Sequence, residues 1–427
     1  MKLLFIHQNF PGQYLHLVQH LRASGQHEII GIGESDNIKK RGTIYGITTL
    51  GYAKPKGPSQ GTHHYLQSTE AAVRRGQSVA RSLLRLRDKG FTPDVICAHP
   101  GWGEALFLRD IYPDTPILMF CEFFFDAYKA DMVFDPEFPA TPDAQFAVRV
   151  RNAPQLLSLP AANALVSPTA WQISRYPAAF RQEIQQIHDG IDTDYMYPDP
   201  AASLRLEPQE TPGESRLAQD GPLVLGRKDK IVTFVVRNIE PYRGAHVFLR
   251  ALPELQKRHP DTHILIAGDN GASYSRSLPE GQTYKQKLLE ELEGKLDFSH
   301  IHFLGKIPYS ALRNLFRITT AHVYLTYPFV LSWSALEAMA CECLLVASKT
   351  EPVQEVVRHE ENGLLVDFFD HEKLISTLDA VLSRPHDFDH LRSAARETIL
   401  RDYCLSTCLE RHTALLNDLA AGSYPRG

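Results

Sequence analysis

Two arginines six positions apart, Arg237 and Arg243, offer the clearest chemistry in this sequence. Arg237 directly follows the apolar run 231–236, and Arg243 precedes Gly244, where an amphipathic segment begins. Guanidinium groups and the free N–H groups of a helix N-terminus both bind phosphate oxygens, so this turn suits a diphosphate. The alternative is that both arginines are solvated and pair with surface carboxylates.

A second group of candidate residues follows the apolar run 322–325. There a loop leads into a helix predicted at 334–340, whose first backbone N–H groups are free to meet negatively charged oxygens. Glu337 in that helix has two interpretations: it closes a capping box with Ser334, or it binds the hydroxyls of a ribose. A third segment, 303–308, ends another strand with Gly305, which lets the backbone approach a flat ring.

These residues need elements that position them, and the sequence predicts parallel sheets. Short apolar runs alternate with amphipathic segments over 1–198 and again over 230–402, which is typical of sheets covered by helices on both faces. Residues 199–229 are rich in Pro, Gly, Glu and Ser, as expected of a linker or an inserted loop. We therefore expect an α/β protein with two doubly wound, Rossmann-like domains facing each other across a cleft. A helix at 403–427 could pack back onto the first domain.

Composition narrows the class of protein. The 427 residues include 45 Lys and Arg against 50 Asp and Glu, a formal charge of −5, which argues against a nucleic-acid-binding protein. The six scattered cysteines suit a reducing compartment rather than a disulfide framework. The start shows no signal-peptide core, and no apolar run approaches the roughly 18 to 20 residues that cross a bilayer. We expect a cytoplasmic protein, at most attached peripherally to the inner membrane surface.

The segment 73–89 is basic and amphipathic, because five arginines and a lysine are interleaved with leucines and valines. Such a helix can lie on anionic lipid. The favoured alternative is an ordinary helix of a βα unit, with its apolar stripe on the sheet.

Taken together and in this order, the segments resemble the retaining glycosyltransferases of family 4, which share the two-domain GT-B fold. The resemblance covers nearly the whole chain. Besides the segments already described, the matching motifs lie at 7–13, 98–104, 167–172 and 188–192.

The resemblance implies a UDP- or GDP-linked sugar donor, bound mainly by the second domain without a metal ion. Arg237 and Arg243 would hold the diphosphate and stabilise it as it leaves, with Arg243 in place of the lysine that is usual in the family. Gly12 would let a loop of the first domain approach the donor. The Asp192 and Asp194 pair lies away from this site and is not expected to bind a metal.

The same resemblance assigns the rest of the donor site. Glu337 would bind the ribose hydroxyls, and Ile307 would frame the base. Backbone N–H groups of Val330, Leu331 and Ser332 would contact the sugar or its phosphate.

The sequence departs from the family pattern at two positions. Phe329 stands where the first of two glutamates is usual, eight residues before Glu337. Without that carboxylate, the family pattern does not identify the donor sugar. Glu122 occupies the place of a histidine in the first domain. A carboxylate there could orient the acceptor hydroxyl, or accept its proton if aromatic burial raises its pKa towards neutrality. The alternative is that Glu122 binds backbone or a cation.

His99 follows the strand predicted at 94–97 and faces the same region. It either lines the acceptor pocket or is a hydrogen-bonded structural histidine. The neighbouring Trp102 offers an aromatic platform for a sugar.

The function expected from these residues is that of a retaining, metal-independent, hexosyltransferase-like glycosyltransferase. It would move a sugar from a nucleotide-diphosphate sugar to a hydroxyl of a glycan, a glycolipid or another acceptor. The alternatives are a sugar-nucleotide epimerase or hydrolase on the same fold, which would need no acceptor, and a non-catalytic protein that binds nucleotide sugars.

Overall fold

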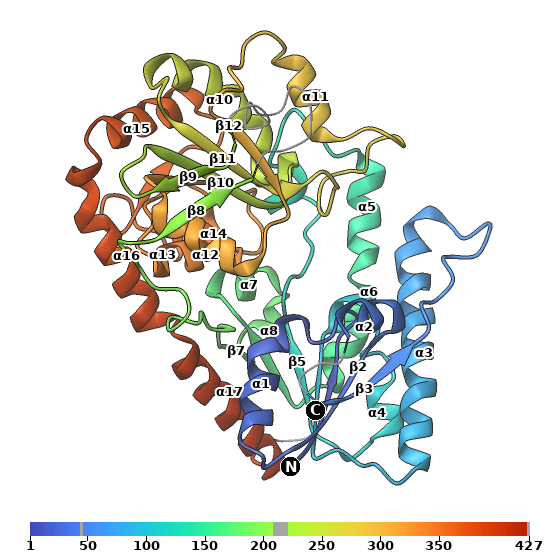
Figure 1. Ribbon diagram of the computed structural model, residues 1–427. Coiled ribbons are helices and arrows are strands. Elements are labelled where there is room, and N and C mark those ends of the chain that lie inside the picture. Colours follow the sequence, from blue (N-terminus) through green and yellow to red (C-terminus); the bar gives the residue numbers. More distant parts are fainter. Residues whose placement is uncertain (43–45, 208–220, 425–427) are drawn as a thin grey trace. The chain divides into compact units, whose positions relative to one another are not determined.

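The computed structural model describes residues 1–42, 46–207 and 221–424 (Figure 1). The chain forms two compact units, Met1–Gly190 with Leu405–Gly427, and Ile191–Cys404. It therefore leaves the first unit after Gly190 and returns to it at Leu405. Each unit is an α/β structure built on its own parallel sheet, as expected for two Rossmann-like domains.

The first unit contains a seven-stranded parallel sheet in the order β3-β2-β1-β4-β5-β6-β7. Its strands are short, and β4, β5 and β6 are buried along their whole length, which explains their continuous hydrophobic runs. The strands are β1 (Lys2–Ile6), β2 (Glu28–Glu34), β3 (Thr48–Tyr52), β4 (Val95–Ala98), β5 (Ile117–Phe120), β6 (Ala164–Ser167) and β7 (Ile184–Gln186). The α-helices are α1 (Leu15–Ala23), α2 (Ser35–Arg41), α3 (Gln67–Asp88), α4 (Leu108–Ile111), α5 (Pro142–Arg151), α6 (Ala153–Ser158), α7 (Ala170–Arg175), α8 (Ala178–Arg181) and α17 (Leu405–Ala420).

Alternate residues of β1 supply the two cores of the first unit. Leu3 and Phe5 pack in one cluster with apolar residues of α1 and α17. Leu4 and Ile6 pack in the other, with Val79 of α3. Because successive side chains of a strand point to opposite faces, helices are needed on both sides of the sheet. The returning helix α17 is therefore part of the core of the first unit.

The second unit contains a six-stranded parallel sheet in the order β12-β11-β10-β13-β14-β15. Its strands are β10 (Ile231–Asn238), β11 (His263–Asp269), β12 (Ile301–Gly305), β13 (Ala321–Tyr324), β14 (Leu345–Ser348) and β15 (Leu364–Val366). Its α-helices are α10 (Ala245–Arg258), α11 (Tyr284–Glu291), α12 (Tyr309–Ile318), α13 (Trp333–Ala340), α14 (Glu351–Gln354), α15 (His371–Ser383) and α16 (Asp389–Asp402).

The segment predicted as a linker, 199–229, contains an antiparallel hairpin of β8 (Ser203–Leu206) and β9 (Leu223–Gly226). Leu204, Leu206 and Leu225 from this hairpin are buried in the core of the second unit. The part between the strands, 208–220, lies outside the described residues.

Strand order reverses between β1 and β4 in the first unit and between β10 and β13 in the second. Ligands of open parallel sheets bind at such points, outside the carboxyl ends of the strands. The short 3₁₀ helices η1 (Gly12–Tyr14), η3 (Pro100–Trp102) and η6 (Pro241–Arg243) begin a few residues after the ends of β1, β4 and β10. Gly12 and Arg243 lie in these turns, and His99 is the cap residue of η3.

No disulfide joins any of the six cysteines, and five of them are buried, where they pack as small apolar side chains. Among the described residues, no helix combines the length and the apolar character that a membrane span requires.

Candidate functional site

Arg243 is buried without a counter-ion in the second unit. Only 8% of the residue is exposed, and none of the ion pairs among the described residues involves it. Its Nη1 donates to Thr326 Oγ1 at 2.7 Å and to Tyr324 Oη at 3.4 Å, and its Nη2 donates to the Val330 carbonyl at 3.2 Å. These three acceptors are neutral, whereas a guanidinium group has five N–H donors. A buried charge with unfilled donors indicates a site for an anion.

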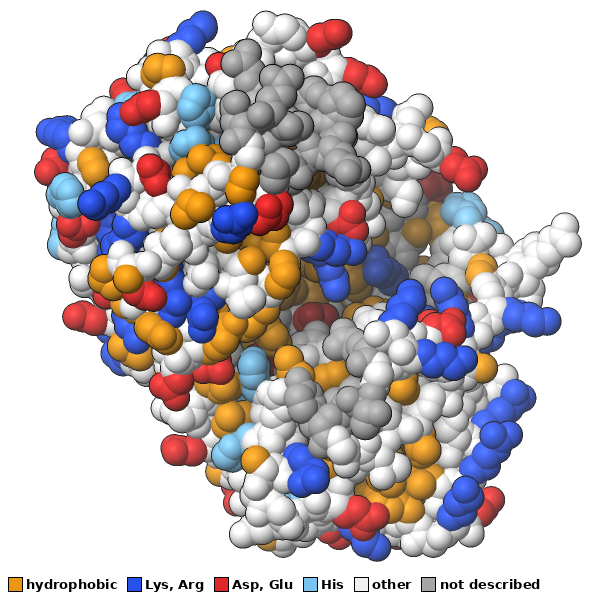
Figure 2. Space-filling view, viewed as in Figure 1, with side chains coloured by type: hydrophobic (Ala, Val, Ile, Leu, Met, Phe, Trp, Pro, Cys, Tyr) orange, Lys and Arg blue, Asp and Glu red, His pale blue; other side chains and the backbone are white. Residues whose placement is uncertain are grey.

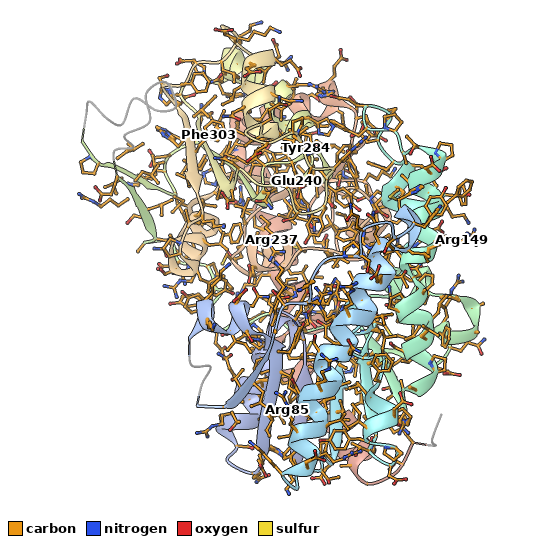
Figure 3. The ribbon with its side chains drawn as sticks, turned by 90° about the vertical axis from the view of Figure 1, so that its right-hand side faces the viewer. Arg85, Arg149, Arg237, Glu240, Tyr284 and Phe303 are labelled. Atoms are coloured by element: carbon orange, nitrogen blue, oxygen red, sulfur yellow. The ribbon has the colours of Figure 1, made fainter. Side chains whose placement is uncertain are left out.

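Arg237 lies at the end of β10 and is exposed (Figure 3). It forms no hydrogen bond or ion pair with the part of the chain that the structure describes. Within the described ranges neither arginine pairs with a carboxylate, although Arg237 is solvated, as the alternative interpretation expects. Two permanent cations remain at the carboxyl end of this strand.

Glu337 is buried, with 6% of the residue exposed, and its Oε1 accepts a hydrogen bond of 2.7 Å from Tyr309 Oη. Burial raises the pKa of Glu337, and the hydrogen bond from Tyr309 opposes this. The capping-box interpretation is wrong, because α13 begins earlier than the sequence suggests. Ser332 is the N-cap residue, so Ser334 is the second residue of the helix and Glu337 the fifth.

The loop before α13 is held from within the unit. The Val330 carbonyl accepts a hydrogen bond from Arg243 Nη2, and the Ser332 N–H donates to Tyr324 Oη at 2.9 Å. Ser332 is therefore not a free donor. The N–H groups of Val330 and Leu331 have no acceptor in the described parts of the chain.

Ile307 lies between β12 and α12, partly buried against the core. Gly305, just before it, has a φ of +60°, a conformation that suits glycine. Nothing in the geometry speaks against a flat ring at this position, and the assignment of Ile307 to the base stays a prediction.

In the first unit, Glu122 follows β5 and is held by two side chains. His99 Nε2 lies 3.2 Å from its Oε2, and Gln13 Nε2 donates to its Oε1 at 2.7 Å. The Gly101 N–H donates to His99 Nδ1 at 3.0 Å, so the ring carries its proton on Nε2 and donates it to Glu122.

The condition under which Glu122 could accept a proton, a pKa raised by burial, is not met. Burial does raise the pKa of Glu122, but the hydrogen bonds from His99 and Gln13 outweigh burial and lower the pKa below its ordinary value. Glu122 is therefore an ionised hydrogen-bond acceptor at neutral pH.

Aromatic rings surround His99. Trp102 stacks on it with ring centroids 4.0 Å apart and planes 15° apart, and His7 contacts both rings edge-on. Gly12 has a φ of +52°, and a Cβ there would overlap the His7 ring. Gly12 therefore permits close packing within the first unit, and its approach to a donor stays a prediction.

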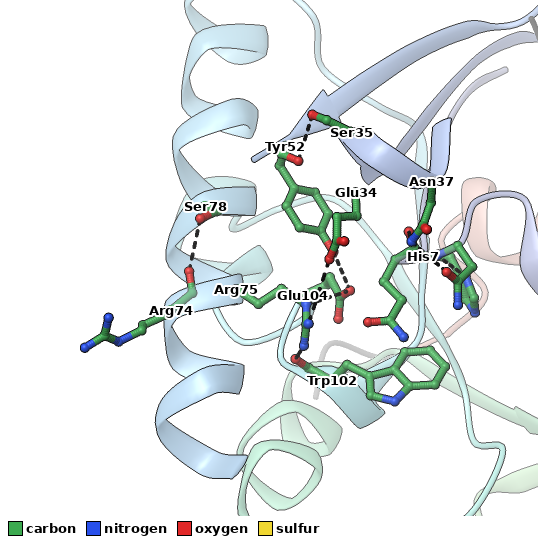
Figure 4. Close-up of polar contacts among 12 residues, drawn as sticks. His7, Glu34, Ser35, Asn37, Tyr52, Arg74, Arg75, Ser78, Trp102 and Glu104 are labelled. Carbon is green, nitrogen blue, oxygen red and sulfur yellow. Dashed lines mark hydrogen bonds and ion pairs between the residues drawn. The ribbon is translucent and has the colours of Figure 1, made fainter. Parts of the chain in front are cut away.

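A cluster that the sequence analysis missed lies behind Trp102 (Figure 4). Arg75 Nη1 donates to the Trp102 carbonyl at 3.1 Å, and the guanidinium lies 3.7 Å from Glu104 and 4.0 Å from Glu34. Tyr52 Oη donates to Glu104 at 2.8 Å. Burial raises the pKa of Glu104 although Arg75 opposes it. No spacing in the sequence links these residues, because they come from β2, β3, α3 and the turn after β4.

The two parallel sheets and the turns at their strand ends define the GT-B class of fold. Solved structures share it along nearly their whole length. A glycosyltransferase from Rickettsia africae aligns with a TM-score of 0.64 at 16% identity, covering 98% of each chain. Anabaena HepE, in complex with UDP and glucose, aligns with a TM-score of 0.68 at 17% identity, covering 98% of this chain and 100% of its own.

Two family models match the sequence, the glycosyl transferase family 4 group over residues 25–196 and the glycosyl transferases group 1 over residues 224–398. The chain belongs to the family 4 glycosyltransferases.

Among curated relatives, a GDP-mannose-dependent alpha-(1-6)-phosphatidylinositol monomannoside mannosyltransferase of Mycolicibacterium smegmatis is 25% identical over 260 residues, 57% of this chain and 59% of that protein. A D-inositol 3-phosphate glycosyltransferase of Segniliparus rotundus is 26% identical over 227 residues, 53% of this chain and 44% of its own. The chain thus matches about half the length of these relatives.

Proposed function

We propose that the protein transfers a sugar from a nucleotide-diphosphate sugar to an acceptor hydroxyl, with retention of the anomeric configuration. The observation that carries this proposal is Arg243, a buried cation whose partners are all neutral. The names of relatives support a UDP- or GDP-linked donor, since HepE was solved with UDP and glucose and the mycobacterial relative depends on GDP-mannose.

In this mechanism the bond between the anomeric carbon and the diphosphate breaks as the acceptor oxygen attacks from the same face. The acceptor proton passes to the departing phosphate oxygen, so no enzyme nucleophile is needed. Arg243 and Arg237 stabilise the negative charge that collects on the leaving group. We propose that these guanidinium groups make a metal ion unnecessary for this step.

Glu337 is proposed to bind the ribose of the donor. On the acceptor side, the ionised Glu122 orients the attacking hydroxyl by accepting its hydrogen bond, while His99 fixes the carboxylate. Trp102, stacked on the buried His99, presents a ring on which a sugar acceptor can rest.

The first test is a thermal-shift screen of nucleotide sugars, because a ligand that binds only the folded state raises its melting temperature. Hits are then assayed for transfer in the presence of EDTA, and the anomeric configuration of the product is read by NMR. Conversion of the donor without an acceptor would indicate an epimerase or a hydrolase. Binding without transfer across a broad acceptor panel would indicate a non-catalytic protein.

Variants at the donor site sharpen this test. Arg243→Ala should lower turnover about 100- to 1000-fold, the usual cost of losing a group that stabilises developing charge. Arg384→Ala removes a guanidinium from an exposed side chain in the same unit and serves as the control. Glu337→Ala should weaken donor binding about 10- to 100-fold, as expected for lost hydrogen bonds to a charged group. Activity of Arg243→Ala equal to that of the control would refute the proposal.

We also propose a peripheral contact with anionic membrane through α3 and α5 of the first unit. The inward stripe of α3 packs on the core, as predicted, but Val73 and Leu84 are exposed on its outer side beside Arg81 and Arg85. Figure 2 shows basic side chains along α3, and Figure 3 shows Arg85 on α3 and Arg149 on α5. Apolar and basic side chains on one face suit a lipid surface.

Sedimentation with vesicles tests this contact. Binding to vesicles with phosphatidylglycerol should fall in an Arg81→Glu, Arg85→Glu variant and persist in an Arg358→Glu, Arg384→Glu control. Equal binding of both variants to the vesicles would count against a membrane contact through α3 and α5.

A further inference from the structure

The loop that follows β11 is anchored to the turn that carries Arg243. Glu240, fully buried, accepts hydrogen bonds from three consecutive backbone N–H groups of this loop, those of Ser273 at 3.1 Å, Tyr274 at 3.1 Å and Ser275 at 2.8 Å. A carboxylate that receives three backbone donors fixes the local path of the chain.

Two further bonds join the same segments. Asn238 Nδ2 donates to Ser273 Oγ, and the Tyr242 N–H donates to Ser275 Oγ at 3.2 Å. The tip of the loop is thus tied at three points to residues 238–242, immediately before Arg243.

This anchoring sets the ring of Tyr274 over the buried cation. The Arg243 guanidinium lies 5.3 Å from the centroid of Tyr274 and 5.7 Å from that of Phe329. The two rings lie 4.9 Å apart, at 56° to each other. Arg243 and Phe329 are buried, whereas 38% of Tyr274 is exposed, so Tyr274 is the outermost member of the group.

We propose that Tyr274 contacts the sugar ring of the donor and helps to select it, and that Glu240 is its positioning residue. This rests on the proposed function. If Arg243 binds the diphosphate, the sugar attached to the terminal phosphate lies within a few bonds of the guanidinium. An aromatic ring beside a phosphate site offers an apolar surface to the C–H face of a pyranose.

The position in the sheet favours the sugar over the base. The base is expected beyond β12, at the edge of the sheet, whereas Phe329, the ring that packs on Tyr274, follows β13 on the other side of β10. Tyr274 itself follows β11, so the pair of rings meets over the end of β10, two strands away from β12.

Calorimetric titration tests the proposal with two probes, the nucleoside diphosphate and the nucleotide sugar that the thermal-shift screen identifies. Tyr274→Ala should weaken binding of the nucleotide sugar about 5- to 10-fold, in keeping with an aromatic contact, and leave binding of the nucleoside diphosphate within about twofold. Tyr274→Phe, which keeps the ring, should bind both ligands like the wild type.

The chain offers a matched control. Tyr197, 41% exposed, lies 4.2 Å over the guanidinium of Arg317 in the same unit. Tyr197→Ala removes the same kind of contact and should change neither affinity.

Glu240 is tested by its effect on Tyr274. Glu240→Gln should raise KM for the donor with little change in kcat, and the double variant with Tyr274→Ala should be no worse than Tyr274→Ala alone. Additive losses would overturn the positioning role of Glu240.

The outcomes separate the two proposals. If the wild type binds no nucleotide sugar, the proposed function fails and this inference with it. If it binds one and Tyr274→Ala binds both probes unchanged, or loses both equally, only the contact of Tyr274 with the sugar is refuted.

Discussion

At the scale of single residues, partners decide what a charged group can do. Burial alone would raise the pKa of Glu122 and make it a stronger base, yet the hydrogen bonds from His99 and Gln13 lower that pKa. The arginine pair was recognisable from residue type and position after a strand. The neutral surroundings of Arg243 were not, because its partners lie 81 to 87 positions further along the chain.

The ionised state of Glu122 gives a prediction about pH. Because its pKa is lowered, Glu122 does not titrate between pH 6 and 8, and Glu122→Gln should lower kcat/KM without changing the shape of the pH profile in that range. The measurement is kcat/KM from pH 5.5 to 8.5 for both proteins. A rising limb near pH 6 to 7 that disappears in Glu122→Gln would show that Glu122 acts as a base.

At the scale of elements, the apolar runs located the strands and most helices well, because continuous burial leaves a clear pattern. Helix starts were less certain. The start of α13 lies at the cap Ser332, which depends on a loop held by Tyr324 and Arg243. The start of α10 depends on Gly244, with a φ of +72°, where a Cβ would overlap the side chain of Leu325.

Gly244→Ala should therefore destabilise the second unit for two reasons, the left-handed conformation and the clash with Leu325. Gly281 separates these effects, because it has a φ of +81° and nothing within 4 Å of an added Cβ. We expect Gly281→Ala to cost about 1–2 kcal/mol, and Gly244→Ala about 1–3 kcal/mol more because of overpacking. Denaturant titration followed by circular dichroism measures both. Equal losses of unfolding free energy in the two variants would mean that the Leu325 side chain moves aside without destabilising the unit.

At the scale of the whole molecule, both units bury neutral histidines. Burial lowers the pKa of His188 to about 3 and that of His412 to about 4 in the first unit. It lowers the pKa of His302 to about 4 and that of His322 to about 3 in the second. The sequence showed nineteen histidines without a pattern, since their burial depends on how the sheets are covered.

These histidines predict loss of stability in mild acid. In the unfolded chain they take up protons below about pH 6.5, whereas in the folded chain they do so only near pH 3 to 4. The stabilising contribution is complete above about pH 6.5 and falls as the pH drops towards 4. Melting temperatures should be similar at pH 8 and 7 and decline at pH 6 and 5.

The control for this prediction is His64, whose side chain is 60% exposed. His64→Gln should leave the decline unchanged, whereas His302→Asn should make it shallower. A melting temperature that stays constant down to pH 5 would show that other groups compensate.

The chain crosses from the first unit to the second at Gly190–Ile191 and returns at Cys404–Leu405. Within each unit, the residues at the two crossings are neighbours. A Cβ on Gly190 would lie 2.7 Å from Leu405 Cα, and Ile191 pairs with Cys404, its N–H bound to the Tyr403 carbonyl at 2.8 Å. The second unit is thus an insertion whose ends meet, which is the arrangement that tolerates excision. A gene that encodes 191–404 by itself, and another that splices codon 190 directly to codon 405, should each yield a folded product, so that donor and acceptor affinities can be assigned to separate polypeptides.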